Sequence, residues 1–204
     1  DGIYRRFYAG HEGSLGMDGF THHRTPTTTI TDKRGNPTMT PQRLLATAIN
    51  PAMEELDLQG VPPNAHAARL MLAIALQESG LRYRRQITPG GQENGPAASY
   101  WQFEAGGGCK GVLTHKAVAS KMLNICNAFD VNPTQQGLWE AMRYNDIVAA
   151  CAARLLIVTL PWRLPTTADE GWKQYNEAWR PGKPHPETWA KHWQNASTIV
   201  GVVA

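Results

Sequence analysis

The sequence has few cysteines, and they form no pattern of the kind that scaffolds a small protein. Its 204 residues contain 3 Cys, at positions 109, 126 and 151. An odd number at scattered spacing argues against a disulfide framework, and neither a CxxC pair nor an HExxH motif points to a metal site. We therefore expect no metal and no cofactor. Cys126 and Cys151 lie on apolar helical faces, where a free cysteine acts as a small buried hydrophobe.

Long hydrophobic runs are also missing. The longest apolar stretch, around residues 149–160, is interrupted by Arg154 and is too short to cross a bilayer. The first residues lack the charged-then-apolar pattern of a signal peptide, so we expect none. The glycine-rich segment 106–111 lacks the GxxxxGK[ST] spacing of a phosphate-binding loop and is expected to form a lip or a tight backbone passage.

Positive charge exceeds negative charge only slightly. The net charge is +3, and charged residues make up 18% of the chain. The basic residues form no long stripe interleaved with aromatic residues, which argues against nucleic-acid binding. The one basic trio, at positions 82, 84 and 85, is expected to be a solvated surface.

The chain divides into two parts of different composition. Residues 1–38 are rich in Gly, Thr, Arg and His and have few aliphatic side chains, so they are expected to form an extended arm with little core. Residues 39–204 carry helical apolar periodicity and are expected to form one domain. The arm is a candidate for docking onto other proteins.

The domain is expected to be mainly α, with a small β element or a long irregular loop. Residues 82–112 are the glycine-rich irregular segment, and a short extended piece is expected to include Tyr100–Phe103. Thr40 and Pro41 open the first helix, and Pro51 is expected to kink or split it. The helices are expected at about 41–58, 64–79, 114–129, 133–142, 146–160, 169–179 and 186–195.

Glu78 is the most informative single residue. The periodicity predicts that it lies in the last turn of an apolar helix, with Asn64 as N-cap and Gly80 as C-cap. The negative end of the helix dipole and apolar neighbours both disfavour the charged carboxylate, so its pKa should rise. A carboxylic acid that stays protonated near neutral pH can act as a general acid.

Three motifs in order resemble those of the lysozyme-like superfamily, the lytic transglycosylases and goose-type lysozymes. They are Glu78-Ser79 at a helix end, the segment 99–103 in the following loop, and Gln174-Tyr175-Asn176 on a late helix. The match covers about residues 64–180. The resemblance implies a lysozyme-like helical domain that cleaves the β-1,4 bond between N-acetylmuramic acid and N-acetylglucosamine in a peptidoglycan strand.

The resemblance also implies roles for individual residues. Glu78 would protonate the glycosidic oxygen, and Tyr175 would hydrogen-bond to its carboxyl. Substrate contacts would come from residues of all three motifs: Ser79, Tyr100, Trp101, Gln102 and Asn176.

The reaction outcome depends on whether a second carboxylate is present. The transglycosylases of this superfamily use one carboxylate and close the muramyl 6-hydroxyl onto C1, whereas inverting hydrolysis needs a second carboxylate roughly 6.5–9.5 Å away. Glu104 is the first candidate for that second carboxylate, ahead of Glu93 and Asp146. The sequence leaves both outcomes open.

Aromatic side chains support a sugar-binding groove, because sugar rings stack on them. Trp101 is equally compatible with a groove or the core, whereas Trp189 and Trp193, at i and i+4, favour the core.

The motifs also depart from the superfamily. Pro96-Ala97 and Ser99 replace its glycine positions, and Tyr100-Trp101 replaces its Leu-Met pair. A non-catalytic structural virion protein with the same fold, and a chitinase-like glycosidase, therefore remain alternatives. Such domains without a signal peptide resemble those of bacteriophages, found in the virion or in the host cytoplasm before they act on the cell wall.

Overall fold

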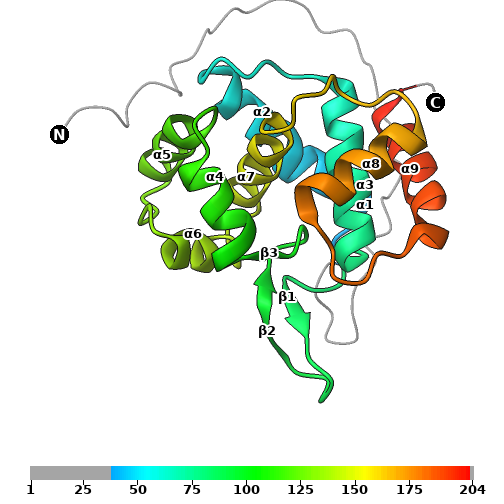
Figure 1. Cartoon of the computed structure of the whole chain (residues 1–204), viewed down its shortest axis with the longest axis horizontal. Coiled ribbons are helices and arrows are strands. Elements are labelled where there is room, and N and C mark those ends of the chain that lie inside the picture. Colours follow the sequence, from blue (N-terminus) through cyan, green and yellow to red (C-terminus); the bar gives the residue numbers. More distant parts are fainter. Residues whose placement is uncertain (1–37, 203–204) are drawn as a thin grey trace, which may run out of the picture. The chain divides into compact units, whose positions relative to one another are not determined.

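The fold is mainly α-helical with one small antiparallel sheet (Figure 1), as the sequence predicts. The computed structural model describes residues 38–202, so the expected arm lies, apart from its last residue, outside the described residues. Within residues 38–202, no helix is both long and apolar enough to cross a membrane. The elements in chain order are α1 (Pro41–Leu44), η1 (Leu45–Ile49), α2 (Asn50–Asp57), α3 (Ala65–Ser79), β1 (Arg85–Ile87), β2 (Glu93–Ala98), β3 (Phe103–Glu104), η2 (Ala105–Cys109), α4 (Lys110–Thr114), α5 (Ala119–Ala128), α6 (Gln135–Ala141), α7 (Asp146–Val158), α8 (Ala168–Trp179) and α9 (Pro186–Val200).

The first helical segment begins as its sequence predicts and is then interrupted before Pro51. The Thr40 side chain accepts a hydrogen bond from the backbone N–H of Arg43 at 3.2 Å, and Pro41 occupies the first turn. A π-helical stretch, η1, separates α1 from α2, and Pro51 lies in the first turn of α2. There the missing N–H of proline breaks no α-helical hydrogen bond within α2.

The helix expected over 114–129 is present but begins later than predicted, because α4 ends at Thr114 and α5 covers Ala119–Ala128. The chain leaves helical geometry at His115 and re-enters it at Ala119. The backbone N–H of Ala117 donates to Nδ1 of His115 at 3.3 Å. A side chain that bonds to nearby backbone in this way competes with a continuous helix.

The extended segment expected at Tyr100–Phe103 is instead mostly a turn, and the strands lie on either side of it. The sheet has the order β1-β2-β3, and Ala98 on β2 is paired with Phe103 on β3. Residues 99–102 form the tight turn between those two strands. Its backbone has positive φ at Ser99 (66°) and Gln102 (51°), values that period-2 reasoning cannot anticipate for non-glycine residues.

The core is built around α3 and α7. Every residue from 67 to 76 on α3 is buried, and so is every residue from 148 to 157 on α7. The three cysteines are free and buried, which confirms the expectation for Cys126 and Cys151. Helix α3 is therefore fixed over most of its length, which gives its C-terminal end a defined position.

Candidate active site

The C-terminal end of α3 presents Glu78. Asn64 caps the other end, where its side chain accepts hydrogen bonds from the N–H groups of His66 (2.8 Å) and Ala67 (3.3 Å). The helix stops at Gly80, which has a left-handed φ of 56° that glycine adopts without steric cost. Both expected caps are confirmed, and Glu78 lies in the last turn.

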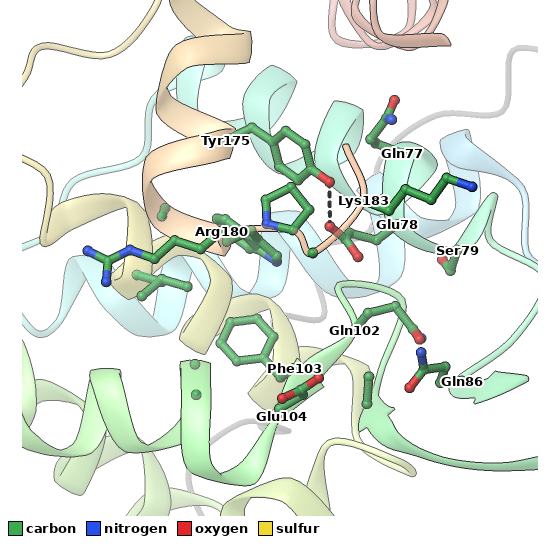
Figure 2. Close-up of a pocket in the computed structure, with 18 of the residues that line it drawn as sticks. Gln77, Glu78, Ser79, Gln86, Gln102, Phe103, Glu104, Tyr175, Arg180 and Lys183 are labelled. Atoms are coloured by element: carbon green, nitrogen blue, oxygen red, sulfur yellow. Dashed lines mark hydrogen bonds between the residues drawn. The ribbon is translucent and has the colours of Figure 1, made fainter. Parts of the chain in front are cut away.

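Tyr175 on α8 reaches the Glu78 carboxyl across 97 positions of sequence. Its hydroxyl donates a hydrogen bond to Oε1 of Glu78 at 2.7 Å, and Figure 2 shows the two side chains pointing toward each other. Helix α8 begins with a complete capping box, in which the Thr167 side chain and the Glu170 side chain each bond to the other residue's backbone. Tyr175 is 3% exposed, and its ring stacks on that of Trp189, with ring centroids 5.4 Å apart.

Burial sets the protonation of both groups. It raises the pKa of Glu78 from 4.5 to about 6, because the charged carboxylate loses solvation, and the Tyr175 hydrogen bond offsets part of this rise. Burial also raises the pKa of Tyr175, and the neighbouring Glu78 adds to the effect. The tyrosine is thus a permanent donor, whereas Glu78 exchanges a proton near neutral pH.

Glu78 and Tyr175 open onto a cavity of about 750 Å³. Its wall is built from the end of α3, the sheet, η2, the end of α8 and the loop that follows α8. Of the residues expected at the site, Glu78, Ser79, Gln102, Glu104 and Tyr175 all line this cavity. The remaining wall comprises Gln77, Tyr83, Arg85, Gln86, Ile87, Ala97, Phe103, Gly107, Gly108, Leu156, Ala178, Trp179, Arg180, Pro181, Gly182, Lys183 and His185.

Gln102 is positioned by the turn that it closes. Its backbone N–H and its side-chain Nε2 both donate to the carbonyl of Ser99, at 3.2 and 2.8 Å. Its side-chain oxygen accepts no hydrogen bond from the described residues, and Gln102 and Glu104 both line the cavity (Figure 2). A fixed amide with a free oxygen is suited to orienting a polar ligand.

Ser79 ties this turn to the helix. Its Oγ lies 2.8 Å from the Tyr100 carbonyl oxygen and 3.0 Å from that of Ala75, and it accepts from the N–H of Leu81 at 3.2 Å. These contacts occupy its hydroxyl proton and one acceptor lone pair within the protein. Ser79 therefore holds the Gln102 turn against the end of α3, and it also lines the cavity.

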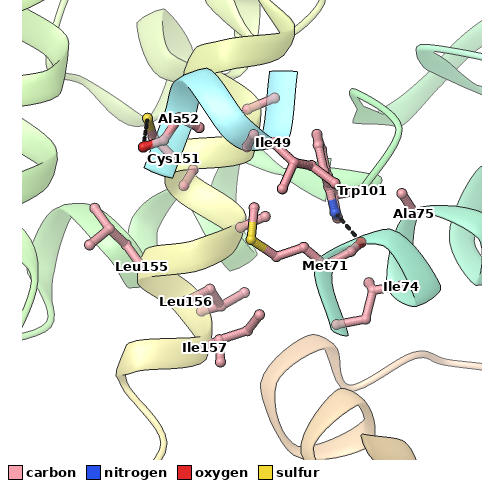
Figure 3. Packing of buried hydrophobic residues seen from close by; sticks show 14 of the residues in the cluster. Ile49, Ala52, Met71, Ile74, Ala75, Trp101, Cys151, Leu155, Leu156 and Ile157 are labelled. Atoms are coloured by element: carbon pink, nitrogen blue, oxygen red, sulfur yellow. Dashed lines mark hydrogen bonds between the residues drawn. The ribbon is translucent and has the colours of Figure 1, made fainter. Parts of the chain in front are cut away.

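The prediction that Trp101 and Tyr100 contact the substrate is wrong, because both side chains are buried. Trp101 is 0% exposed, and its indole N–H donates to the Met71 carbonyl at 2.8 Å, inside the core (Figure 3). Tyr100 is 4% exposed, and the Arg84 guanidinium lies 4.8 Å from its ring centroid. Neither lines the cavity, because the turn at 99–102 directs both rings into the protein.

Asn176 also lies outside the cavity. Its side-chain amide donates to the carbonyl of Trp172 one turn earlier on α8, at 2.8 Å. Its neighbour Tyr175 faces α3 and the cavity, and consecutive helical residues point about 100° apart. Asn176 therefore bonds to its own helix and does not line the cavity of Glu78.

Among the three candidate second carboxylates, the structure brings only Glu104 to the cavity of Glu78. Asp146 accepts two hydrogen bonds from Arg84, at 2.7 and 2.9 Å, beside the N-cap Asn145 of α7. Glu93 is exposed at the start of β2 and lines neither this cavity nor the smaller one beside it. Glu104 follows Phe103 on β3 and is labelled on the cavity wall in Figure 2.

No family model, curated protein or solved structure matches this chain. The interpretation of the site therefore depends on its own chemistry. Over residues 38–202, no group of three or more His, Cys, Asp and Glu side chains is arranged to hold a metal ion.

Sequence reasoning missed much of the cavity wall. Tyr83 and Ile87 flank or lie on β1, are 40% and 36% exposed, and line the cavity with apolar surface. Tyr83 lies among the three basic residues 82, 84 and 85, and their charge favours the interpretation of that segment as a solvated surface rather than as part of a site. The segment 180–185 after α8 forms another part of the wall, and the cluster of Pro and Gly within it was the available signal for a functional loop.

Proposed function

We propose that this protein is a glycosidase that cleaves the β-1,4 bond between N-acetylmuramic acid and N-acetylglucosamine in peptidoglycan, with Glu78 as its general acid. The observation that carries the proposal is the 2.7 Å hydrogen bond between Tyr175 and a carboxyl whose pKa is raised to about 6, in a cavity large enough for sugar rings. The order of the three motifs supports the choice of substrate.

The residues divide the chemistry between them. Protonated Glu78 gives its proton to the glycosidic oxygen as the C1–O bond breaks, and the sugar ring takes on oxocarbenium character. The Tyr175 hydroxyl keeps the carboxyl oriented and donates to the carboxylate that remains. The free amide oxygen of Gln102 is available to the sugar's N-acetyl N–H or hydroxyl groups.

Two products are open to this arrangement. If the muramyl 6-hydroxyl attacks C1, Glu78 takes back the hydroxyl proton and the product is a 1,6-anhydro sugar. If water attacks, Glu104 is the carboxylate that can take its proton, and a reducing end results.

Digestion of purified peptidoglycan tests the proposal. We expect soluble muropeptides to be released, and mass spectrometry of their muramyl ends separates anhydro from reducing products. Chitin oligomers provide the comparison substrate. Cleavage of chitin without cleavage of peptidoglycan would assign chitin as the substrate in place of peptidoglycan. The absence of cleavage of either polymer would overturn the proposal.

The pH dependence of the reaction should follow Glu78. Because the acid must be protonated and its pKa is about 6, kcat/KM should fall about tenfold for each pH unit above 6. In Tyr175→Phe, a hydrogen bond that lowers this pKa is lost, so the alkaline limb should move to higher pH. Profiles of kcat/KM from pH 4 to 9 for the wild type and for Tyr175→Phe measure the slope and the shift. An alkaline limb at the same pH in both proteins would contradict the assignment of Glu78 as the general acid.

A further inference from the structure

A second, smaller cavity adjoins the first. Its volume is about 470 Å³, and it shares Arg85 and Glu104 with the cavity of Glu78. The rest of its wall comes from β2, η2 and α6, namely Asn94, Gly95, Pro96, Ala105, Gly106, Gln136 and Trp139. A ligand that spans both cavities must pass the two shared charged side chains.

Arg85 is held in a fixed position at this junction. Its Nε and Nη2 donate to the carbonyls of Gly95 and Asn94, each at 3.2 Å. Its guanidinium lies 5.5 Å from the centroid of the Trp139 ring, and that ring is itself anchored by an indole N–H bond to the Pro96 carbonyl at 2.7 Å. These contacts use two of the five N–H donors of the guanidinium, so it retains donors for a carboxylate.

Neither shared charge is paired with an opposite charge in the part of the chain that the structure describes. Over residues 38–202, neither Arg85 nor Glu104 forms a salt bridge, and Glu104 has no hydrogen bond through its side chain. Arg84, the neighbour of Arg85, behaves differently, since it forms a two-bond pair with Asp146. An unpaired cation and an unpaired anion on one cavity wall complement a ligand that carries both an ammonium and a carboxylate group.

We propose that the second cavity binds the peptide branch of the glycan, with Arg85 contacting a carboxylate of the peptide and Glu104 an amino group. This inference rests on the proposed function and deepens it, because it makes the preferred substrate a peptide-substituted strand rather than a peptide-free one. Asn94 and Gln136 supply side-chain amides that can hydrogen-bond to the peptide groups of the branch, and Trp139 supplies part of the wall. The charged groups of the branch would contact Arg85 and Glu104.

Matched substrates test this inference. The kcat/KM values on peptide-bearing glycan strands and on the same strands stripped of peptide by an amidase give a preference ratio. We expect a wild-type ratio of about tenfold or more, the usual size of a charge-assisted hydrogen bond, and a clearly smaller ratio in Arg85→Gln, which keeps only the Glu104 contact. Lys191→Gln, which removes an exposed charge on α9 outside both cavities, should leave the ratio unchanged.

A binding measurement separates this inference from the proposed reaction. By calorimetry, a soluble disaccharide–tetrapeptide should bind about tenfold more tightly than the same disaccharide without peptide, and both Arg85→Gln and Glu104→Gln should reduce that difference. The exposed side chain of Glu104 forms no hydrogen bond or salt bridge with the described residues, so Glu104→Gln should fold and stays informative if Arg85→Gln fails to fold. Equal binding of the two ligands by the wild type overturns the inference. Cleavage of stripped and peptide-bearing strands at equal rates does so too, and leaves the proposed function standing.

Discussion

Glu78→Gln is expected to reduce the cleavage of peptidoglycan by about 10²–10⁴-fold, the contribution typical of a positioned general acid. The glutamine side chain keeps the volume of glutamate, and its amide oxygen can still accept the Tyr175 hydrogen bond. It has no acidic proton to give to the leaving oxygen. The measurement is the initial rate of muropeptide release by wild type and variant at pH 5.5, where wild-type Glu78 is largely protonated.

Glu54→Gln is the matched control for that variant. Glu54 is exposed on α2 and lines neither cavity, so the same chemical change there should leave the rate unaltered. A Glu78→Gln protein with the wild-type rate would exclude Glu78 as the acid.

Thermal unfolding shows whether Glu78→Gln loses activity without losing its fold. The pKa of Glu78 is raised from 4.5 to about 6 in the folded protein, so the folded state favours the protonated form. The wild type therefore loses stability as pH rises from about 4.5 through 6 and the buried carboxyl ionises. The glutamine variant has no such loss, and its Tm relative to wild type should be higher at pH 7.5 than at pH 4.5.

The sequence was most informative where local signals and burial agree. Helix α3 has an apolar face, an Asn64 cap and a Gly80 stop, and these three signals place its ends correctly. Tyr175 could be placed beside Glu78 only through the resemblance, because no local rule brings together residues 97 positions apart. The structure confirms their contact.

Sequence reasoning failed where the path of the backbone decides which side chains face the cavity. In segment 99–104, Trp101 and Gln102 are adjacent, yet one is buried in the core and the other lines the cavity. The cause is the turn with positive φ at Ser99 and Gln102, which no hydrophobic period encodes. An aromatic ring next to a candidate site residue is equally compatible with a sugar platform and a core anchor until its backbone is known.

Trp101→Ala is expected to destabilise the protein by about 3–5 kcal/mol, the usual cost of truncating a large aromatic side chain in a core. Trp101 is 0% exposed and donates its indole N–H to the Met71 carbonyl on α3, so the variant loses both packing and a buried hydrogen bond. The turn that carries Gln102 also depends on this anchor. Denaturant unfolding measures the free energy, and Tm should fall by about 10 °C.

Trp162→Ala provides the matched truncation. Trp162 is 40% exposed and contacts the Lys173 ammonium, 4.8 Å from its ring centroid, so its loss should cost less than about 1 kcal/mol. If Trp101 were instead a platform for sugar rings, Trp101→Ala would raise KM and leave the unfolding free energy close to that of Trp162→Ala. A large loss of stability from Trp101→Ala beside a small one from Trp162→Ala distinguishes the anchor from the platform, because a buried ring contributes packing and a hydrogen bond to folding and an exposed platform does not.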